Sequence, residues 1–96
     1  MKSASPTDKL IYEPVSANFV NTEVLRTPEL RQRRKDNLYM ALILGNNYNK
    51  ISYLSTHTTD GPQLIEGILF ALTDDYVILK GGDKVPVVAI EEVRIY

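Results

Sequence analysis

The last third of the chain alternates short apolar runs with residues that favour turns. Between residues 63 and 96, three runs rich in Val, Ile, Leu and aromatic side chains are separated by Thr-Asp-Asp at 73–75 and Gly-Gly-Asp at 81–83. Apolar runs of this length, divided by turn-forming residues, are typical of antiparallel strands joined by hairpins. The pattern therefore predicts an antiparallel meander in this part of the chain.

Five strands are expected in all, at residues 50–56, 64–73, 76–80, 85–88 and 92–96. The first alternates between two sets of side chains with period two, and a turn at 58–62 follows, in which Gly61 supplies a positive φ. The second is apolar on both faces and contains Gly67, which predicts a sharp bend or bulge. A strand that bends and buries both faces indicates a small barrel. Pro86 cannot donate to a ladder, so its strand is expected at an edge or a bulge.

A helix precedes the strands, and its first residues are marked clearly. Thr27 is a favourable N-cap, Pro28 suits the first helical position, and Glu29 lies at the positive end of the helix dipole. Gly45 tolerates the left-handed conformation that ends many helices. These signals predict a helix over residues 28–44.

The second half of this predicted helix, residues 38–44, is apolar on all sides. A helix that is hydrophobic all round must be covered all round. Leu38, Ala41 and Leu42 can face the barrel. Tyr39, Met40 and Ile43 are then left to be covered by the N-terminal arm or by another subunit.

Residues 1–25 form a predicted extended or disordered arm, and residues 26–96 form the helix and barrel domain. Ser, Thr, Asn, Asp and Pro interrupt the arm so often that no helix or strand period persists. Two apolar clusters, at 10–12 and 19–20, interrupt this polar composition. They can lie over the domain or a neighbouring subunit, or they can recruit a protein partner that orders the arm on binding.

The composition is that of one small domain. The chain has 96 residues and a net charge of −1, and it lacks cysteine. Domains of this length bury only about 60–65 % of the surface that they expose when unfolded, so association of subunits would add stability. Neither a signal peptide nor a run of about 18 apolar residues is found. We therefore expect a cytoplasmic protein without a membrane span, a disulfide or a thiolate metal site.

A helix followed by five short strands, the second bent at a glycine, resembles the Sm-like barrel of the bacterial Hfq proteins. The resemblance covers residues 28–96 and is sharpest at residues 67–69, 74–80 and 85–93, where Asp74 and the pair Ala89-Ile90 match Hfq positions. It implies a mainly β fold with one N-terminal helix, namely a five-stranded antiparallel SH3-like barrel. It also implies a homo-oligomer that binds single-stranded RNA. Pro86-Val87-Val88 replaces the Tyr-Lys-His with which Hfq holds uridine-rich RNA, and one extra residue separates Gly67 from Asp74.

Catalytic motifs are not found in the sequence. The sole histidine, His57, is expected in an exposed loop without a second histidine or a cysteine to complete a metal site. The adjacent carboxylates at 74–75 and 91–92 are expected to point apart in solvated turns, and Asp74 is expected to cap its own turn. The glycines at 81–82 are not followed by a helix, which favours a hairpin turn over a phosphate loop. We expect neither an enzyme nor a cofactor.

Charge is distributed unevenly along the chain. Residues 26–36 hold five basic and two acidic side chains, a local +3, whereas residues 60–96 hold three basic and seven acidic ones, a local −4. One hypothesis is that the helix contacts the phosphates of single-stranded RNA and that tyrosines stack on its bases. The residues in this set are Arg31, Arg33, Arg34, Lys35, Tyr39 and Tyr48. The alternative is a solvated helix face that pairs with acidic turns of a neighbouring subunit, which include Asp74 and Asp75.

The last two predicted strands are apolar enough to be sheet edges that require cover. In Sm-like rings such edges pair between subunits, and the residues expected at this contact are Val85, Val87, Val88, Val93 and Ile95. The sequence thus favours an oligomeric RNA-binding module. A protein–protein assembly module without a nucleic-acid role is the alternative.

Overall fold

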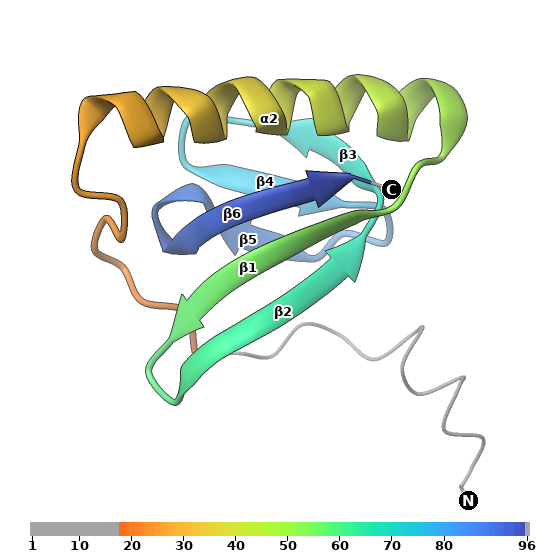
Figure 1. Ribbon diagram of the computed structural model, residues 1–96. Helices are drawn as coiled ribbons and strands as arrows, with labels where there is room; N and C mark the ends of the chain where they lie inside the picture. The colour runs from red at the N-terminus through yellow and green to blue at the C-terminus, as the bar shows by residue number, and fades with distance from the viewer. Residues whose placement is uncertain (1–17, 96) are drawn as a thin grey trace, which may run out of the picture.

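The computed structural model describes residues 18–95. Strands predominate in this part of the chain, which has one α-helix, six strands and a short 3-10 helix (Figure 1). In chain order these elements are α2 (Pro28–Tyr48), β1 (Ser52–Thr58), β2 (Gly61–Gly67), β3 (Leu69–Leu72), β4 (Tyr76–Leu79), β5 (Lys84–Pro86), η1 (Val87–Ala89) and β6 (Ile90–Ile95).

The six strands form two antiparallel sheets of three strands each, with the orders β2-β1-β6 and β3-β4-β5. The predicted closed barrel of five strands is therefore wrong for the described residues. The expected strand at 64–73 is two strands, because pairing stops at Ile68 and resumes in the other sheet. Helix α2 lies across one side of the molecule over β3 and β6, and the β1–β2 hairpin extends away from it (Figure 1).

The predicted bend at Gly67 lies at this change of sheet. Gly67 is the last residue of β2 and pairs with Ser52. A Cβ atom on Gly67 would lie 3.1 Å from Cδ1 of Leu79 on β4, which is tighter than most real contacts. Glycine therefore lets the two sheets approach each other where the chain crosses between them.

The predicted start of the helix is confirmed, but its predicted end is wrong. The Thr27 hydroxyl oxygen accepts a hydrogen bond of 3.2 Å from the Leu30 N–H. The helix continues past Gly45 to Tyr48, and Asn49 adopts the left-handed conformation instead, with φ of 56°. The N–H groups of Asn49 and Lys50 donate to the carbonyls of Gly45 and Leu44, at 3.0 and 3.3 Å, which completes the C-terminal cap.

Gly45 has a packing role rather than a capping role. It is buried inside the helix, and a Cβ atom there would lie only 2.6 Å from the carbonyl oxygen of Leu69 on β3. The absence of a side chain lets the helix backbone approach the strand backbone directly. Gly45, which the sequence suggested as the end of the helix, therefore lies inside the helix, where it allows close contact with β3.

One face of α2 is buried against the sheets. Its buried residues are Arg34, Leu38, Ala41 and Gly45, which follow the i, i+4, i+7, i+11 spacing of a single helix face. Leu42 is half-buried beside the core, as expected. Tyr39, Met40 and Ile43, which were predicted to need cover, remain 53, 52 and 50 % exposed.

Residues 18–25 pack on the domain. The Val20 N–H donates to the His57 carbonyl at 3.1 Å, and the Thr59 N–H donates to the Asn18 carbonyl at 2.8 Å. Strand β6 pairs with β1 only as far as Thr56, and residues 18–20 bond to the β1 backbone beyond that point. Phe19 packs against the core, so the apolar cluster at 19–20 covers its own domain. The cluster at 10–12 and the rest of the predicted arm lie outside the described residues.

Candidate functional site

The residues predicted to bind RNA are distributed around α2 rather than gathered on one face. Arg31, Lys35 and Tyr39 line one groove beside the helix, together with residues of the β3–β4 turn. Arg33 lines a different groove, beside β6. Tyr48 is nine residues after Tyr39, which places it about 13.5 Å further along the axis and half a turn around the helix. Of the predicted set, Arg31, Arg34, Lys35 and Tyr39 therefore lie together at this groove.

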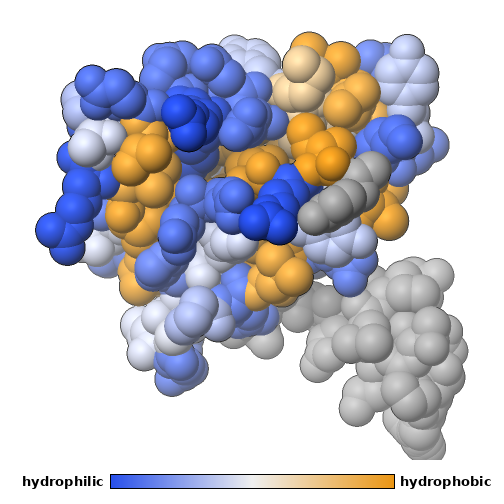
Figure 2. Space-filling view, in the orientation of Figure 1, coloured by the Kyte–Doolittle hydropathy of each residue, from blue (hydrophilic) through white to orange (hydrophobic). Residues whose placement is uncertain are grey.

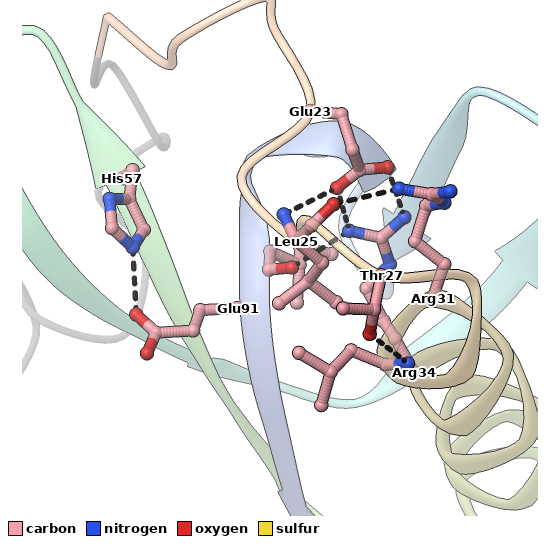
Figure 3. Close-up of polar contacts among 9 residues, drawn as sticks. Glu23, Leu25, Thr27, Arg31, Arg34, His57 and Glu91 are labelled. Carbon is pink, nitrogen blue, oxygen red and sulfur yellow. Dashed lines mark hydrogen bonds and ion pairs between the residues drawn. The ribbon is translucent and has the colours of Figure 1, made fainter.

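Arg34 lies in the interior and makes a bidentate ion pair (Figure 3). Its Nη1 and Nη2 atoms each donate to a carboxylate oxygen of Glu23 at 2.6 Å, and Nη1 also donates to the carbonyl of Ile90 at 3.0 Å. Glu23 accepts a further bond of 3.0 Å from the Leu25 N–H. Because its guanidinium is buried and engaged, Arg34 is removed from the set that can contact a phosphate.

The same ion pair connects three parts of the chain: the segment at 18–25, helix α2 and strand β6. Arg31 reinforces it, since its Nη1 donates to the carbonyl of Leu25 at 2.9 Å (Figure 3). Sequence reasoning missed Glu23 in this role, because the acid lies 11 residues from Arg34 in a segment without a secondary-structure pattern. Only the fold brings the two together.

The hydrogen bonds from Arg34 hold the pKa of the Glu23 carboxyl below its ordinary value of 4.5, although partial burial opposes this shift. A carboxyl whose pKa is lower in the folded state stabilises the fold above its unfolded pKa, and this contribution is lost as the pH falls. We expect the difference in unfolding free energy between wild type and Glu23→Gln to be constant near neutrality and to shrink below about pH 4.5. Urea unfolding from pH 7 to 3 measures it. A difference that stays constant across this range would contradict the assignment.

The groove beside Arg31, Lys35 and Tyr39 has a volume of 370 Å³. Leu38, Leu72 and Val87 form apolar parts of its lining, and Asp74 lies among its lining residues. The acidic turn that was expected to meet a neighbour's basic helix thus borders the basic helix of its own chain. The cap of that turn is Thr73 rather than Asp74, since the Thr73 hydroxyl accepts from the N–H groups of Asp75 and Tyr76.

The predicted intersubunit residues are mostly core residues. Val85 and Val93 are buried, and Val87 and Ile95 are half-buried against the core. Val87 and Val88 belong to η1 rather than to a strand. The side chains expected at a contact between subunits therefore lie wholly or partly in the protein's own interior. Among residues 18–95, β5 and β6 each stand at the end of a sheet.

Within residues 18–95, β5 pairs only with β4, so its other backbone edge faces away from this sheet. Bonds from the Val87 N–H to the Asp75 carbonyl and from the Leu79 N–H to the Asp83 carbonyl flank the β4–β5 ladder. Alternate residues of an antiparallel strand bond to the same neighbour, so Val85 bonds to β4 and the backbones of Lys84 and Pro86 face outward. Lys84 offers a donor and an acceptor there, whereas Pro86 offers only an acceptor.

A groove of 620 Å³ borders this edge of β5. Phe19, Tyr76, Pro86 and Val88 are among its lining residues, and the Lys84 ammonium lies over the Tyr76 ring at 5.7 Å from its centroid. A second groove, of 380 Å³, borders β6 and is lined by Leu25, Leu30, Arg33, Arg34, Asn37, Glu91, Glu92 and Val93. Each open edge thus adjoins a partly apolar depression.

Exposed apolar side chains also gather on α2. Figure 2 shows hydrophobic surface over the C-terminal half of the helix, next to a polar N-terminal half. Besides Tyr39, Met40 and Ile43, the exposed large apolar residues of the helix are Leu30 and Tyr48, and Tyr48 is 68 % exposed. These exposed side chains are not required to pack the helix on its own domain, and exposed apolar patches often mark sites of interaction.

Other chemistry-bearing residues do not form a larger cluster. His57 lies in β1 rather than in a loop, and its Nε2 is 2.7 Å from Oε1 of Glu91 on β6, away from the Arg34 cluster (Figure 3). Within residues 18–95, no group of three or more His, Asp or Glu side chains is arranged to hold a metal ion. In the same range no helix has the length and hydrophobicity to cross a membrane.

Comparison with protein-family models, with curated proteins and with solved structures finds no match to this chain.

Proposed function

We propose that this chain is a non-catalytic, self-assembling binding module whose copies join edge to edge. The outer edge of β5 on one copy pairs with the outer edge of β6 on the next. The observation that carries this proposal is that β5 and β6 each end a different sheet and each adjoin a partly apolar groove. Such a contact is heterologous, so each copy uses both edges and the assembly closes only if the rotation permits.

Three features support the proposal. Open strand edges are templates for pairing with another chain unless they are covered. Exposed apolar side chains on α2, which include Met40 and Tyr48, gain from being buried in an assembly. The resemblance to Sm-like proteins is part of the same proposal, supported by the order of one helix and short antiparallel strands. Barrel closure within one chain is not part of it.

The proposal predicts that blocking the β5 edge dissociates the assembly. Lys84→Pro removes the outward N–H of Lys84 and no hydrogen bond to β4, so we expect a monomer while the fold is retained. Lys84→Ala keeps that donor and is the matched control, which we expect to remain largely assembled. Light scattering after size exclusion gives the mass, and far-UV circular dichroism checks the fold. A monomeric wild-type protein at micromolar concentrations would overturn the proposal.

A second candidate function is binding of single-stranded RNA along the groove of Arg31, Lys35 and Tyr39. The observation that favours it is the placement of two cations and an exposed aromatic ring on one groove wall. Cations can neutralise phosphates and a tyrosine can stack on a base, which is the usual basis of sequence-tolerant binding. A cytoplasmic setting suits both functions, because a chain without cysteine needs no oxidising compartment.

If RNA binds in this groove, its affinity should depend on the helix flank that carries Lys35 and not on the flank that carries Arg33. We expect Lys35→Ala to weaken binding of a short oligouridine severalfold and to lower the salt slope by about one. Arg33→Ala removes the same charge from the opposite flank and should leave affinity nearly unchanged. Fluorescence polarisation at about 50 and 200 mM salt measures both effects. Absence of binding at the lower salt concentration, or equal effects of the two variants, would exclude this groove as an RNA site.

A further inference from the structure

We infer that the apolar cluster of the N-terminal arm, Leu10, Ile11 and Tyr12, docks in the groove beside β5 of its own chain and covers the outer edge of that strand. The docking depends only on the groove and the arm. Its effect, which is to restrain assembly, rests on the proposed function.

The groove beside β5 has apolar walls that are still partly open to solvent. Its volume of 620 Å³ lies within the range of about 300–1,000 Å³ that is usual for binding sites. Tyr76 on β4 is 43 % exposed, and Phe19, Pro86 and Val88 are half-buried. Apolar side chains that enter the groove are therefore stabilised by the removal of this surface from water.

Backbone groups on two segments that line the groove point away from their own strand partners. Val85 bonds to β4, so the backbones of Lys84 and Pro86 face away from β4. Asn18 and Val20 bond to β1, which turns the N–H and carbonyl of Phe19 away from β1. An extended segment in this groove can therefore add backbone hydrogen bonds to its apolar contacts.

The chain itself holds the apolar cluster close to this groove. Asn18, the first described residue, is among the residues that line it. Only residues 13–17 separate Asn18 from Tyr12, so Tyr12 lies within about 20 Å of Asn18 even if this stretch is fully extended. Pro14 and Ser16 in the same stretch favour a turn, which can direct the cluster back to the groove.

This short connection favours the groove of the same chain over that of a second copy. A segment on a short flexible linker meets its site at an effective concentration in the millimolar range, about a thousandfold above a micromolar protein concentration. The entropic cost of closing a loop also falls as the loop becomes shorter. The sequence left open whether the cluster covers its own domain or a neighbour, and the length of the linker favours its own domain.

Docking of the arm and pairing with a second copy exclude each other at β5. The outward backbone groups of Lys84 and Pro86 can bond to one neighbouring strand at a time. An assembly that is joined through this edge must therefore displace the arm first. We expect release of the arm to make assembly easier.

Paired cysteines test the docking, because the chain has no cysteine of its own. Leu10→Cys, Ile11→Cys and Tyr12→Cys are each combined with Asp75→Cys, since Asp75 is exposed and lines the groove beside β5. Combination with Asp74→Cys is the matched control, because this adjacent exposed residue lines the groove beside α2 instead. We expect the fastest Asp75 pair to form a disulfide within one chain about tenfold faster than the fastest Asp74 pair. Non-reducing electrophoresis of dilute, mildly oxidised protein measures this.

A charge placed in the cluster tests the restraint on assembly. Ile11→Asp should release the arm, because an aspartate is costly to bury in an apolar groove. We expect it to assemble at a severalfold lower protein concentration than Ser3→Asp, which adds the same charge outside the cluster. Sedimentation velocity measures both variants, and circular dichroism checks the fold.

The outcomes separate this inference from the proposed function. Equal rates for the Asp75 and Asp74 pairs, or disulfides that join two chains, would overturn the docking and leave the edge-to-edge assembly in place. Faster closure of the Asp75 pairs within one chain would support the docking even if neither wild type nor Ile11→Asp assembles, a result that would overturn the proposed function. In a chain that assembles, equal behaviour of Ile11→Asp and Ser3→Asp would overturn the restraint.

Discussion

Replacing Arg34 with alanine is expected to lower the free energy of unfolding by about 3 kcal/mol. The change removes both 2.6 Å bonds to Glu23 and the bond to the Ile90 carbonyl. Breaking a buried ion pair typically costs about 3 to 5 kcal/mol, because a charge or polar group is left without its partner. The Glu23 side chain is 28 % exposed and can recover some hydration, which places the expected cost at the lower end.

Arg33→Ala is the matched control for this prediction. It removes the same charge from the adjacent, exposed helix position, and we expect a change of at most about 0.5 kcal/mol. Arg34→Lys should recover only part of the loss, because an ammonium cannot make the bidentate contact. Urea denaturation followed by circular dichroism measures all three. If Arg34→Ala were as stable as Arg33→Ala, the ion pair would not contribute to the stability of the fold.

The same substitution should also weaken assembly. Residues 18–21 line the groove beside β5, and Leu25 lines the groove beside β6. Glu23 lies between them and is held by Arg34. Loss of the ion pair therefore loosens the segment that forms part of both proposed contact surfaces.

Replacing Gly45 with alanine is expected to destabilise the fold by about 2 kcal/mol, against the trend for helices. An alanine inside a helix is ordinarily about 1 kcal/mol better than glycine. Here the new Cβ would lie 2.6 Å from the carbonyl oxygen and 3.2 Å from the nitrogen of Leu69. These are backbone atoms of β3 that cannot rotate away, so the helix must shift from the sheet and lose packing.

Asn46→Ala is the comparison for Gly45→Ala. Asn46 is the next helical residue and is exposed. Its replacement should therefore stabilise the fold by about 0.5 kcal/mol through helix propensity alone. Opposite signs at adjacent positions, measured by thermal or urea unfolding, would confirm the close helix–strand approach. A stabilising effect at both positions would show that the helix and β3 are not in backbone contact at Gly45.

Several elements could be predicted from the sequence because their signals are local. The start of α2 depends on a cap, a proline and an acid within three residues, and all three lie where expected. Gly61 has a positive φ, as its turn pattern indicated, and Gly81 and Gly82 lie with positive φ in the predicted turn between β4 and β5. Period-two alternation located β1 to within two residues, since burial of one strand face leaves a direct trace in the sequence.

The direction of a side chain depends on distant contacts that the sequence does not show. The basic run in α2 suggested a phosphate-binding rim, but helical periodicity turns Arg34 inward while Arg33 and Lys35 stay exposed. The valines near the C-terminus suggested an intersubunit contact, but Val85 and Val93 fill the core. In both cases the residue type suggested a binding role, whereas the fold turns the side chain into the interior.

By itself, the sequence determined the helix start, the turns and the succession of short strands, because each depends on neighbouring residues and on the backbone conformations that they permit. Only the tertiary structure decided that the strands form two sheets, that Gly45 is a contact point and that Glu23 holds Arg34. These features arise from groups far apart in the chain, whose burial and pairing are set when the helix packs across β3 and β6.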